Sequence, residues 1–101
     1  MVAIEHRVYY RLKPGTSADQ FMAFYENIIG LKGKIEGIGD IYFKRNISKE
    51  GKDHGCGGFF AVLFKDISSL NTYVGHPEHE RVASEYFRPI RSYAFVADNE
   101  I

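Results

Sequence analysis

The chain has 101 residues, which is enough for one hydrophobic core but not for two. Its 13 Lys and Arg residues balance 13 Asp and Glu residues, so no excess positive charge favours a nucleic acid as partner. Hydrophobic residues make up 45% of the chain and aromatic residues 15%. This composition is that of a globular domain with enough rings to line a pocket or a subunit interface.

The cysteine content and the hydropathy pattern restrict the class of protein further. Cys56 is the single cysteine, which excludes an internal disulfide and a CxxC metal or redox motif. No apolar run approaches the roughly 20 residues that a membrane span needs, and the first residues lack a signal-peptide pattern. We therefore expect one domain, residues 1–101, that lies in the cytoplasm and has no membrane partner.

The first 30 residues predict a strand followed by a helix. Residues 3–12 alternate between two faces, and we expect the face with His6, Val8 and Tyr10 to turn toward a core. Ser17 and Gln20 form a capping-box pattern that starts a helix. The apolar positions of this helix recur every three or four residues, at Phe21, Phe24, Tyr25, Ile28 and Ile29.

Two further strands are predicted next, at residues 40–45 and 56–64, joined by a polar hairpin loop. The second of these strands is apolar on both faces, with Phe60, Val62 and Phe64 on one and Phe59, Ala61 and Leu63 on the other. A strand of this kind is typically covered on both faces. In so short a chain, we expect the helices to cover one face and a second subunit to cover the other.

The remaining residues predict two short helices and a last strand. Asp66 is a good N-cap for the first of them, Pro77 starts the second, and Arg88-Pro89 ends it. The last strand is expected at residues 90–96, with a frayed acidic tail at residues 98–100. The resulting β-α-β-β-α-β order predicts a ferredoxin-like α+β fold, in which helices cover one face of an antiparallel sheet.

The corner between the two short helices, Tyr73-Val74-Gly75-His76-Pro77-Glu78-His79, carries two of the four histidines. Gly75 suits the left-handed position after a helix, and His76 is placed to cap the next one. The positive end of that helix should keep His79 neutral near pH 7. A neutral imidazole beside the phenol of Tyr73 is a candidate acid–base pair. The alternative is that His76 only caps and His79 is a surface residue.

A cavity is expected where this corner packs over the sheet, because His6 would then face His76 or His79. Phe24, Tyr25 and Ile28 would supply its helical wall, and Phe60 would supply a wall from the strand. An apolar cavity with a few convergent polar groups is the usual form of a small-molecule site. The alternative is a filled core in which these side chains only pack.

Other chemistries fit the sequence less well. The three histidines named above could bind a metal ion, but Pro77 and the capping role of His76 restrict that side chain. No GxSxG motif supports a serine hydrolase. A nucleophilic pair of Cys56 and His54 would need a favourable loop, so Cys56 is more simply a small residue at the entry to a strand.

Three segments together resemble the stress-responsive A/B barrel (Dabb) family, over essentially the whole chain. They are the His6 strand running into Leu12-Lys13-Pro14-Gly15-Thr16, the segment Asp53-His54-Gly55, and the corner from Tyr73 to His79. The His-Pro-x-His pattern of the corner is the most specific of them. The resemblance implies a homodimer of ferredoxin-like subunits whose sheets pack face to face as an α+β barrel.

Some members of this family cyclise polyketides by an intramolecular aldol closure, without a cofactor or a metal. The resemblance implies that Tyr73 and His79 are catalytic. It implies that His6 and His76 also line the site. From the strand and helix faces, we expect the substrate to be bound in addition by Val8, Tyr10, Phe24, Tyr25, Ile28 and Phe60. Those cyclases carry a further histidine where this chain has Gly57-Gly58, which changes one wall, and Phe60 indicates a shorter or differently shaped apolar pocket.

Three functions therefore stay open from the sequence. The first is a cofactor-independent polyketide cyclase or lyase acting on a small molecule. The second is a non-catalytic stress-response or small-ligand-binding protein that uses the same pocket. The third is a purely structural dimer, which a filled core beneath the corner would favour.

Overall fold

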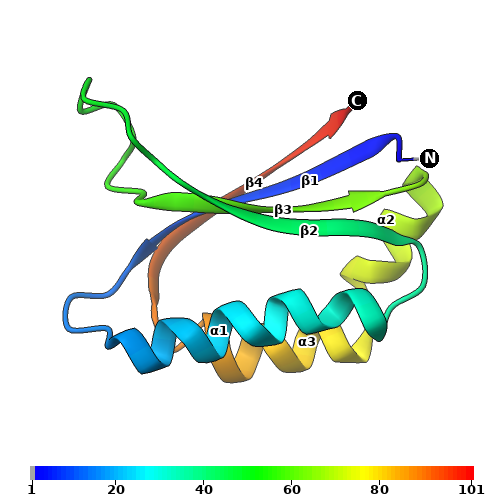
Figure 1. Ribbon diagram of the computed structural model, residues 1–101, viewed down its shortest axis with the longest axis horizontal. Helices are drawn as coiled ribbons and strands as arrows, with labels where there is room; N and C mark the ends of the chain where they lie inside the picture. The colour runs from blue at the N-terminus through cyan, green and yellow to red at the C-terminus, as the bar shows by residue number, and fades with distance from the viewer. Residues whose placement is uncertain (1) are drawn as a thin grey trace.

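The computed structural model describes residues 2–101 and contains one four-stranded antiparallel sheet with helices on one face (Figure 1). The elements follow each other as β1 (Ile4–Leu12), α1 (Ala18–Gly30), the 3-10 turn η1 (Leu31–Gly33), β2 (Ile38–Arg45), β3 (Gly58–Phe64), α2 (Ile67–Val74), α3 (Pro77–Val82), the π-helical turn η2 (Ala83–Phe87) and β4 (Arg91–Glu100). The strand order is β2-β3-β1-β4. The predicted ferredoxin-like α+β subunit is confirmed.

The helix starts follow the local chemistry that the sequence predicts. Ser17 accepts a hydrogen bond from the backbone of Gln20, whose side chain returns one to Ser17, so the capping box of α1 is complete. Asp66 caps α2 through the backbone N–H of Ser69. α1 and α3 run side by side beneath the sheet, and α2 lies at one end of it (Figure 1).

The core lies between the sheet and these helices. The β1 face with His6, Val8 and Tyr10 is buried there, as predicted, and each of these residues is at most 6% exposed. Aromatic side chains dominate the centre, where Phe24 of α1 stacks on Phe87 with ring centroids 4.8 Å apart.

The last strand is longer than the sequence pattern indicates, and the prediction of a frayed tail was wrong. β4 continues to Glu100 because residues 98–100 pair with the first residues of β1, and the N–H of Ile101 donates to the carbonyl of Ala3 at 2.8 Å. Backbone pairing to a central strand outweighs the low strand propensity of Asp98, Asn99 and Glu100. β2 likewise begins at Ile38, two residues before its predicted start.

The sheet face opposite the helices carries aromatic side chains that no helix covers. Tyr9 stacks on Phe95 with ring centroids 4.6 Å apart, and it also contacts Phe59 at 5.1 Å. Phe95 is 40% exposed and Tyr93 is 38% exposed. We call this surface, with Phe59, Tyr9, Phe95 and Tyr93, the open face.

Candidate functional site

The first and last strands place a histidine and an aspartate side by side at the edge of the core. His6 and Asp98 are register partners in the β1–β4 pair, so their side chains share the helix-covered face. The Nδ1 atom of His6 lies 2.6 Å from Oδ1 of Asp98. Because a carboxylate only accepts, Nδ1 donates, and the Nε2 lone pair of a neutral His6 is left for another group.

Tyr73, near the end of α2, packs against His6 from the helix side. It is 0% exposed, and its ring centroid lies 5.5 Å from that of His6 and 5.1 Å from that of Phe64. Its hydroxyl has no hydrogen-bond partner among the described residues. Burial raises the pKa of Tyr73 well above its usual value, so the phenol is a neutral donor. An unpartnered buried hydroxyl is uncommon in proteins and requires an explanation.

The corner between α2 and α3 brings His79 across the ring of Tyr73, with ring centroids 4.3 Å apart. The Nδ1 atom of His79 lies 3.2 Å from the carbonyl oxygen of Val74, which can only accept. Nδ1 therefore carries the proton of the neutral ring, and Nε2 is the basic atom. Burial lowers the pKa of His79, against an opposing effect of the bond to Val74. The predicted neutral imidazole is thus supported, but its first cause is burial and not the helix end.

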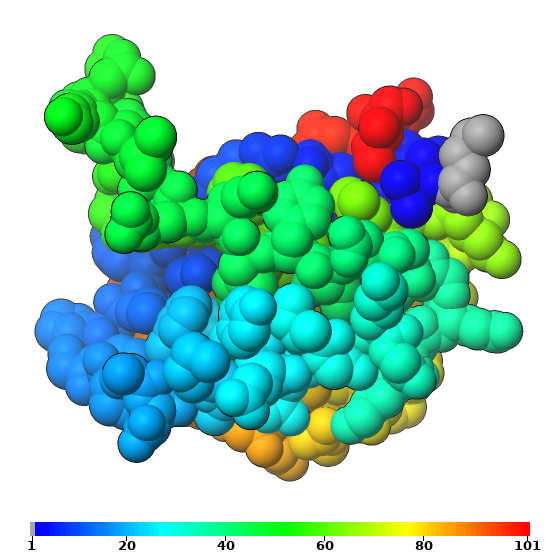
Figure 2. All heavy atoms as spheres, viewed as in Figure 1, coloured from blue at the N-terminus to red at the C-terminus, as the bar shows by residue number. Residues whose placement is uncertain are grey.

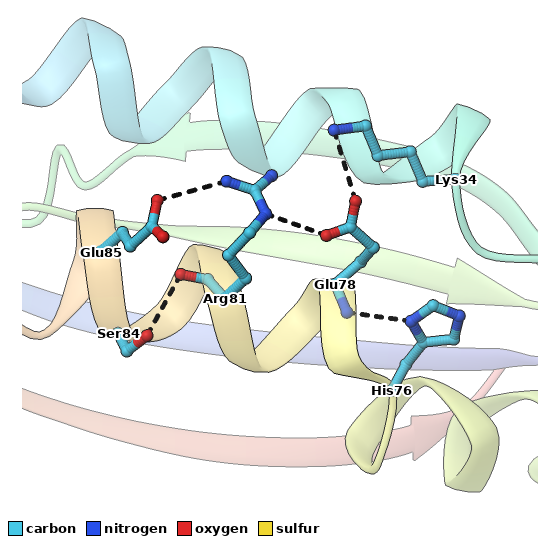
Figure 3. A network of polar contacts seen from close by, with 6 residues as sticks. All are labelled: Lys34, His76, Glu78, Arg81, Ser84 and Glu85. Atoms are coloured by element: carbon cyan, nitrogen blue, oxygen red, sulfur yellow. Dashed lines mark hydrogen bonds and ion pairs between the residues drawn. The ribbon is translucent and has the colours of Figure 1, made fainter.

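His76 occupies the predicted capping position (Figure 3). Its Nδ1 atom accepts a hydrogen bond of 3.1 Å from the backbone N–H of Glu78. Glu78 also pairs with Arg81 at 2.9 Å and with Lys34 at 3.6 Å, which joins α3 to the turn after α1. Gly75 differs from the prediction: its φ of −92° is not left-handed, because the extended backbone of His76 makes the change of direction.

A cavity of about 370 Å³ opens beside these groups, which is within the usual range for small-molecule sites. Its polar and charged lining comes from His6, Tyr73, His79, Arg88, Arg91 and Asp98. Its apolar lining includes Val8, Ile28, Phe60 and Phe87. A cavity of this size counts against the interpretation in which the histidines only pack and cap.

The structure brings six of the predicted site residues to this cavity and leaves four outside it. The six are His6, Val8, Ile28, Phe60, Tyr73 and His79. Phe24 lies in the packed core behind the cavity, Tyr25 packs on Phe43 with centroids 4.9 Å apart, Tyr10 lines a different cavity, and His76 faces Glu78.

The sequence did not predict Asp98 as a site residue, because residues 98–100 were expected to form a frayed acidic tail. A buried histidine on an inward face needs a hydrogen-bond acceptor, and the first and last strands are neighbours in this fold. Together, these two facts indicate that the acceptor for His6 lies on the last strand.

A metal site does not emerge from this arrangement. Within residues 2–101, no three side chains of the types His, Cys, Asp and Glu are grouped closely enough to hold a metal ion. None of the described helices has the length and apolar character of a membrane span.

Comparison with known proteins identifies the family. The sequence profile of the Stress responsive A/B Barrel Domain, Dabb, matches residues 4–101. The chain therefore belongs to this family of α+β domains, as the resemblance predicted.

Individual relatives are distant in sequence and close in fold. Olivetolic acid cyclase from Cannabis sativa is 22% identical over 78 residues, which cover 77% of each chain. A hydroxynitrile lyase from Passiflora edulis has a TM-score of 0.85 at 17% identity, and the match covers 99% of this chain and 94% of the lyase. A dimeric ferredoxin-like protein of unknown function from Jannaschia sp. CCS1 has a TM-score of 0.81 at 22% identity, with 98% and 99% covered.

Proposed function

We propose that this protein is a cofactor-independent cyclase or lyase that acts on a small carbonyl compound. One observation carries the proposal: the unpartnered hydroxyl of Tyr73 is buried beside a cavity, and the ring that bears it packs on the rings of His6 and His79. A buried donor without an acceptor is costly for stability, and a substrate oxygen would supply the missing acceptor. Distant relatives that are named a cyclase and a lyase support this class of reaction.

In an intramolecular aldol closure, the basic Nε2 of His79 would remove a proton from a carbon next to a carbonyl group. The hydroxyl of Tyr73 would donate a hydrogen bond to the carbonyl oxygen as that oxygen gains the negative charge of an enolate. The enolate carbon would then attack a second carbonyl carbon of the same molecule, which forms the new C–C bond. The resulting alkoxide would take the proton that His79 holds, so the enzyme returns to its starting state.

His6 would orient the substrate from β1. Asp98 holds the His6 ring through Nδ1, which leaves Nε2 as an acceptor for a hydroxyl group or an enol of the substrate. Val8, Ile28 and Phe60 would contact the apolar part of the substrate. In this arrangement Asp98 is a positioning residue and does not touch the reacting atoms.

We also infer that the protein works as a homodimer that pairs through the open face. Exposed aromatic patches of this kind usually mark an interface. Structural relatives that are described as dimeric support the pairing. In a face-to-face dimer, each sheet would cover the aromatic side chains that no helix of its own subunit reaches.

A non-catalytic small-ligand protein is the second candidate, because the same cavity would bind a ligand without converting it. Several structural relatives are described as proteins of unknown function, and this favours keeping that candidate.

Turnover assays separate the two candidates. Purified protein would be given a linear poly-β-keto thioester and, separately, the cyanohydrin mandelonitrile, with the products followed by liquid chromatography. We expect product from one substrate class, and a loss of at least about 100-fold in Tyr73→Phe and His79→Gln. His76→Asn is the matched control, since asparagine preserves the helix cap outside the cavity. Binding of both compounds without any product would support the non-catalytic candidate.

A further inference from the structure

A second cavity, of about 460 Å³, lies beneath the loop that joins β2 to β3, at the other end of the sheet from α2. Its lining includes the rings of Tyr10, Phe21 and Phe43 and the side chain of Leu12. In Figure 2 the green loop stands above the blue residues at the end of β1 and the start of α1.

The loop over this cavity is held in place by hydrogen bonds. The side-chain amide of Asn46 donates to Asp53 at 3.0 Å and to the carbonyl of Cys56 at 3.1 Å. The other oxygen of Asp53 accepts from the N–H of Gly55 at 2.9 Å. Arg11 donates to the carbonyl of His54 at 3.0 Å and fastens the loop to β1. The loop is therefore held in one conformation and forms a defined roof over the cavity.

One row across the sheet places a phenol and a guanidinium on either side of a glycine. Tyr10 of β1 pairs with Gly58 of β3, which pairs with Arg45 of β2. Neighbouring strands lie about 5 Å apart, so the Cα atoms of Tyr10 and Arg45 are separated by about 10 Å. Position 58 has to be glycine, because a Cβ atom there would lie 2.5 Å from the carbonyl oxygen of Lys44. Gly58 therefore places no side chain between the two polar residues.

The hydroxyl of Tyr10 is a hydrogen-bond donor that donates to no described residue. It is 6% exposed and lies among aromatic rings that include Phe24 at 5.7 Å and Phe87 at 6.1 Å. Among the described residues, nothing accepts from its hydroxyl, and burial raises the pKa of Tyr10 to about 12. The phenol is therefore neutral at physiological pH and can donate to a ligand oxygen.

The charged residues that line this cavity are all cations, namely Arg11, Lys44 and Arg45. Arg11 bonds to Ser92 and His54, and the ammonium of Lys44 lies 5.6 Å from the centre of the Tyr42 ring on the open face. Arg45 alternates with Lys44 along β2, so its side chain lies on the same face as Phe43. In residues 2–101 it has no ion pair, and it is exposed.

An aromatic wall separates this cavity from the candidate active site. Tyr10 lines the second cavity, and it packs on Phe60 and Phe87, which line the first. The two sites can thus be occupied independently.

We propose that this second cavity binds a small amphipathic carboxylate. Its apolar body lies against Phe21, Phe43 and Leu12, while its carboxylate accepts from the guanidinium of Arg45 and from the hydroxyl of Tyr10, which both line the cavity. An arginine fork and a phenol are well suited to the two oxygens of a carboxylate. The proposal does not depend on the proposed catalysis, because no residue is used by both sites.

Titration of the ¹⁵N-labelled full-length protein with octanoate tests the proposal, with binding followed by amide NMR shifts. We expect saturable shifts at Tyr10, Phe21, Phe43 and Gly57, and smaller or no shifts at His6 and His79. Arg45→Gln should weaken octanoate binding at least tenfold, and Tyr10→Phe should weaken it several-fold. Octan-1-ol, which has the same chain without the charge, should bind at least tenfold more weakly than octanoate.

Lys65→Gln is the control, since it removes one positive charge from an exposed residue that does not line this cavity. Equal weakening by Lys65→Gln and Arg45→Gln would show general charge attraction and would overturn the proposal. So would the absence of saturable shifts, equal binding of octan-1-ol, or shifts confined to the cavity with His6 and His79.

Discussion

Tyr73 and His79 lie on two different helices, yet their ring centroids are 4.3 Å apart because the chain turns at His76 between them. Tyr73 is fully buried, and His79 is half-buried. Both side chains line a single cavity. This pair is the centre of the proposed function.

Tyr73→Phe should raise the stability of the free protein while it removes activity. The substitution deletes a buried hydroxyl that has no partner, and leaving such a group unsatisfied costs about 1–3 kcal/mol. We expect the free energy of unfolding in urea to rise by about 1 kcal/mol. A loss of stability would show that the hydroxyl has an acceptor in solution, and this would remove the observation on which the proposed function rests.

His79 should make the protein less stable as the pH falls below about 6.5, the ordinary pKa of histidine. Burial lowers the pKa of His79 in the folded state, so the unfolded chain takes up the proton first. The stabilising contribution is therefore complete above that pH and is lost as the pH falls toward the folded pKa. Urea unfolding of the native chain and of His79→Gln at several pH values would measure it. Parallel curves for the two proteins would contradict the prediction.

Asp98→Ala should free the ring of His6 without unfolding the protein. The substitution removes the acceptor at 2.6 Å, and a hydrogen bond to a charged group that is partly open to water contributes about 1 kcal/mol. Nitrogen chemical shifts of the imidazole should change from the Nδ1-protonated form to a mixture of both tautomers. Asn99→Ala, on the opposite face of β4, should leave the His6 shifts unchanged. An unaltered tautomer in Asp98→Ala would show that Asp98 does not position the ring.

Gly58 and Gly57 should respond differently to the same added methyl group. A Cβ atom at Gly58 would meet the carbonyl oxygen of Lys44 at 2.5 Å, whereas one at Gly57 would meet nothing within 4 Å. Gly58→Ala should lower the free energy of unfolding by about 1–3 kcal/mol, and Gly57→Ala should change it by less than about 1 kcal/mol. Equal effects at both positions would mean that β2 and β3 can move apart at Gly58 without a loss of stability.

The open face should control the oligomeric state. Phe95→Asp places a charge in the centre of the aromatic surface and should convert a dimer to a monomer in light-scattering measurements. Met22→Asp on α1 is the control, because Met22 is 45% exposed on the helical side. A dimer that persists in Phe95→Asp would place the interface elsewhere.

The sequence predicted the elements well where a periodic pattern or a cap defines them. The stripe from Phe21 to Ile29 and the capping box at Ser17 locate α1, and the two-faced strand 56–64 locates the centre of the sheet. The His6 face of β1 was also predicted correctly, because alternation along a strand fixes which side chains share a face.

The sequence failed where pairing between distant segments decides the outcome. Nothing local to Asp98 indicates a strand, and only its backbone bonds to β1 hold it in one. Tyr10 was expected in the same cavity as His6, since both lie on one face. The strand is long enough to cross from one cavity to another, and Phe60 and Phe87 fill the space between them.

The pairing of His6 with Asp98 joins side chains that are 92 positions apart in the chain. Asp98 can therefore reach His6 only after β4 has paired with β1. Because Asp98 lies near the end of the chain, this contact can form only when nearly the whole chain has been synthesised. A chain shortened before residue 98 would keep Tyr73 and His79 but would lose the acceptor of His6, and β1 would be unpaired on this side from Ile4 to His6. The final residues thus determine both the completeness of the site and the protection of this end of the sheet from pairing with other chains.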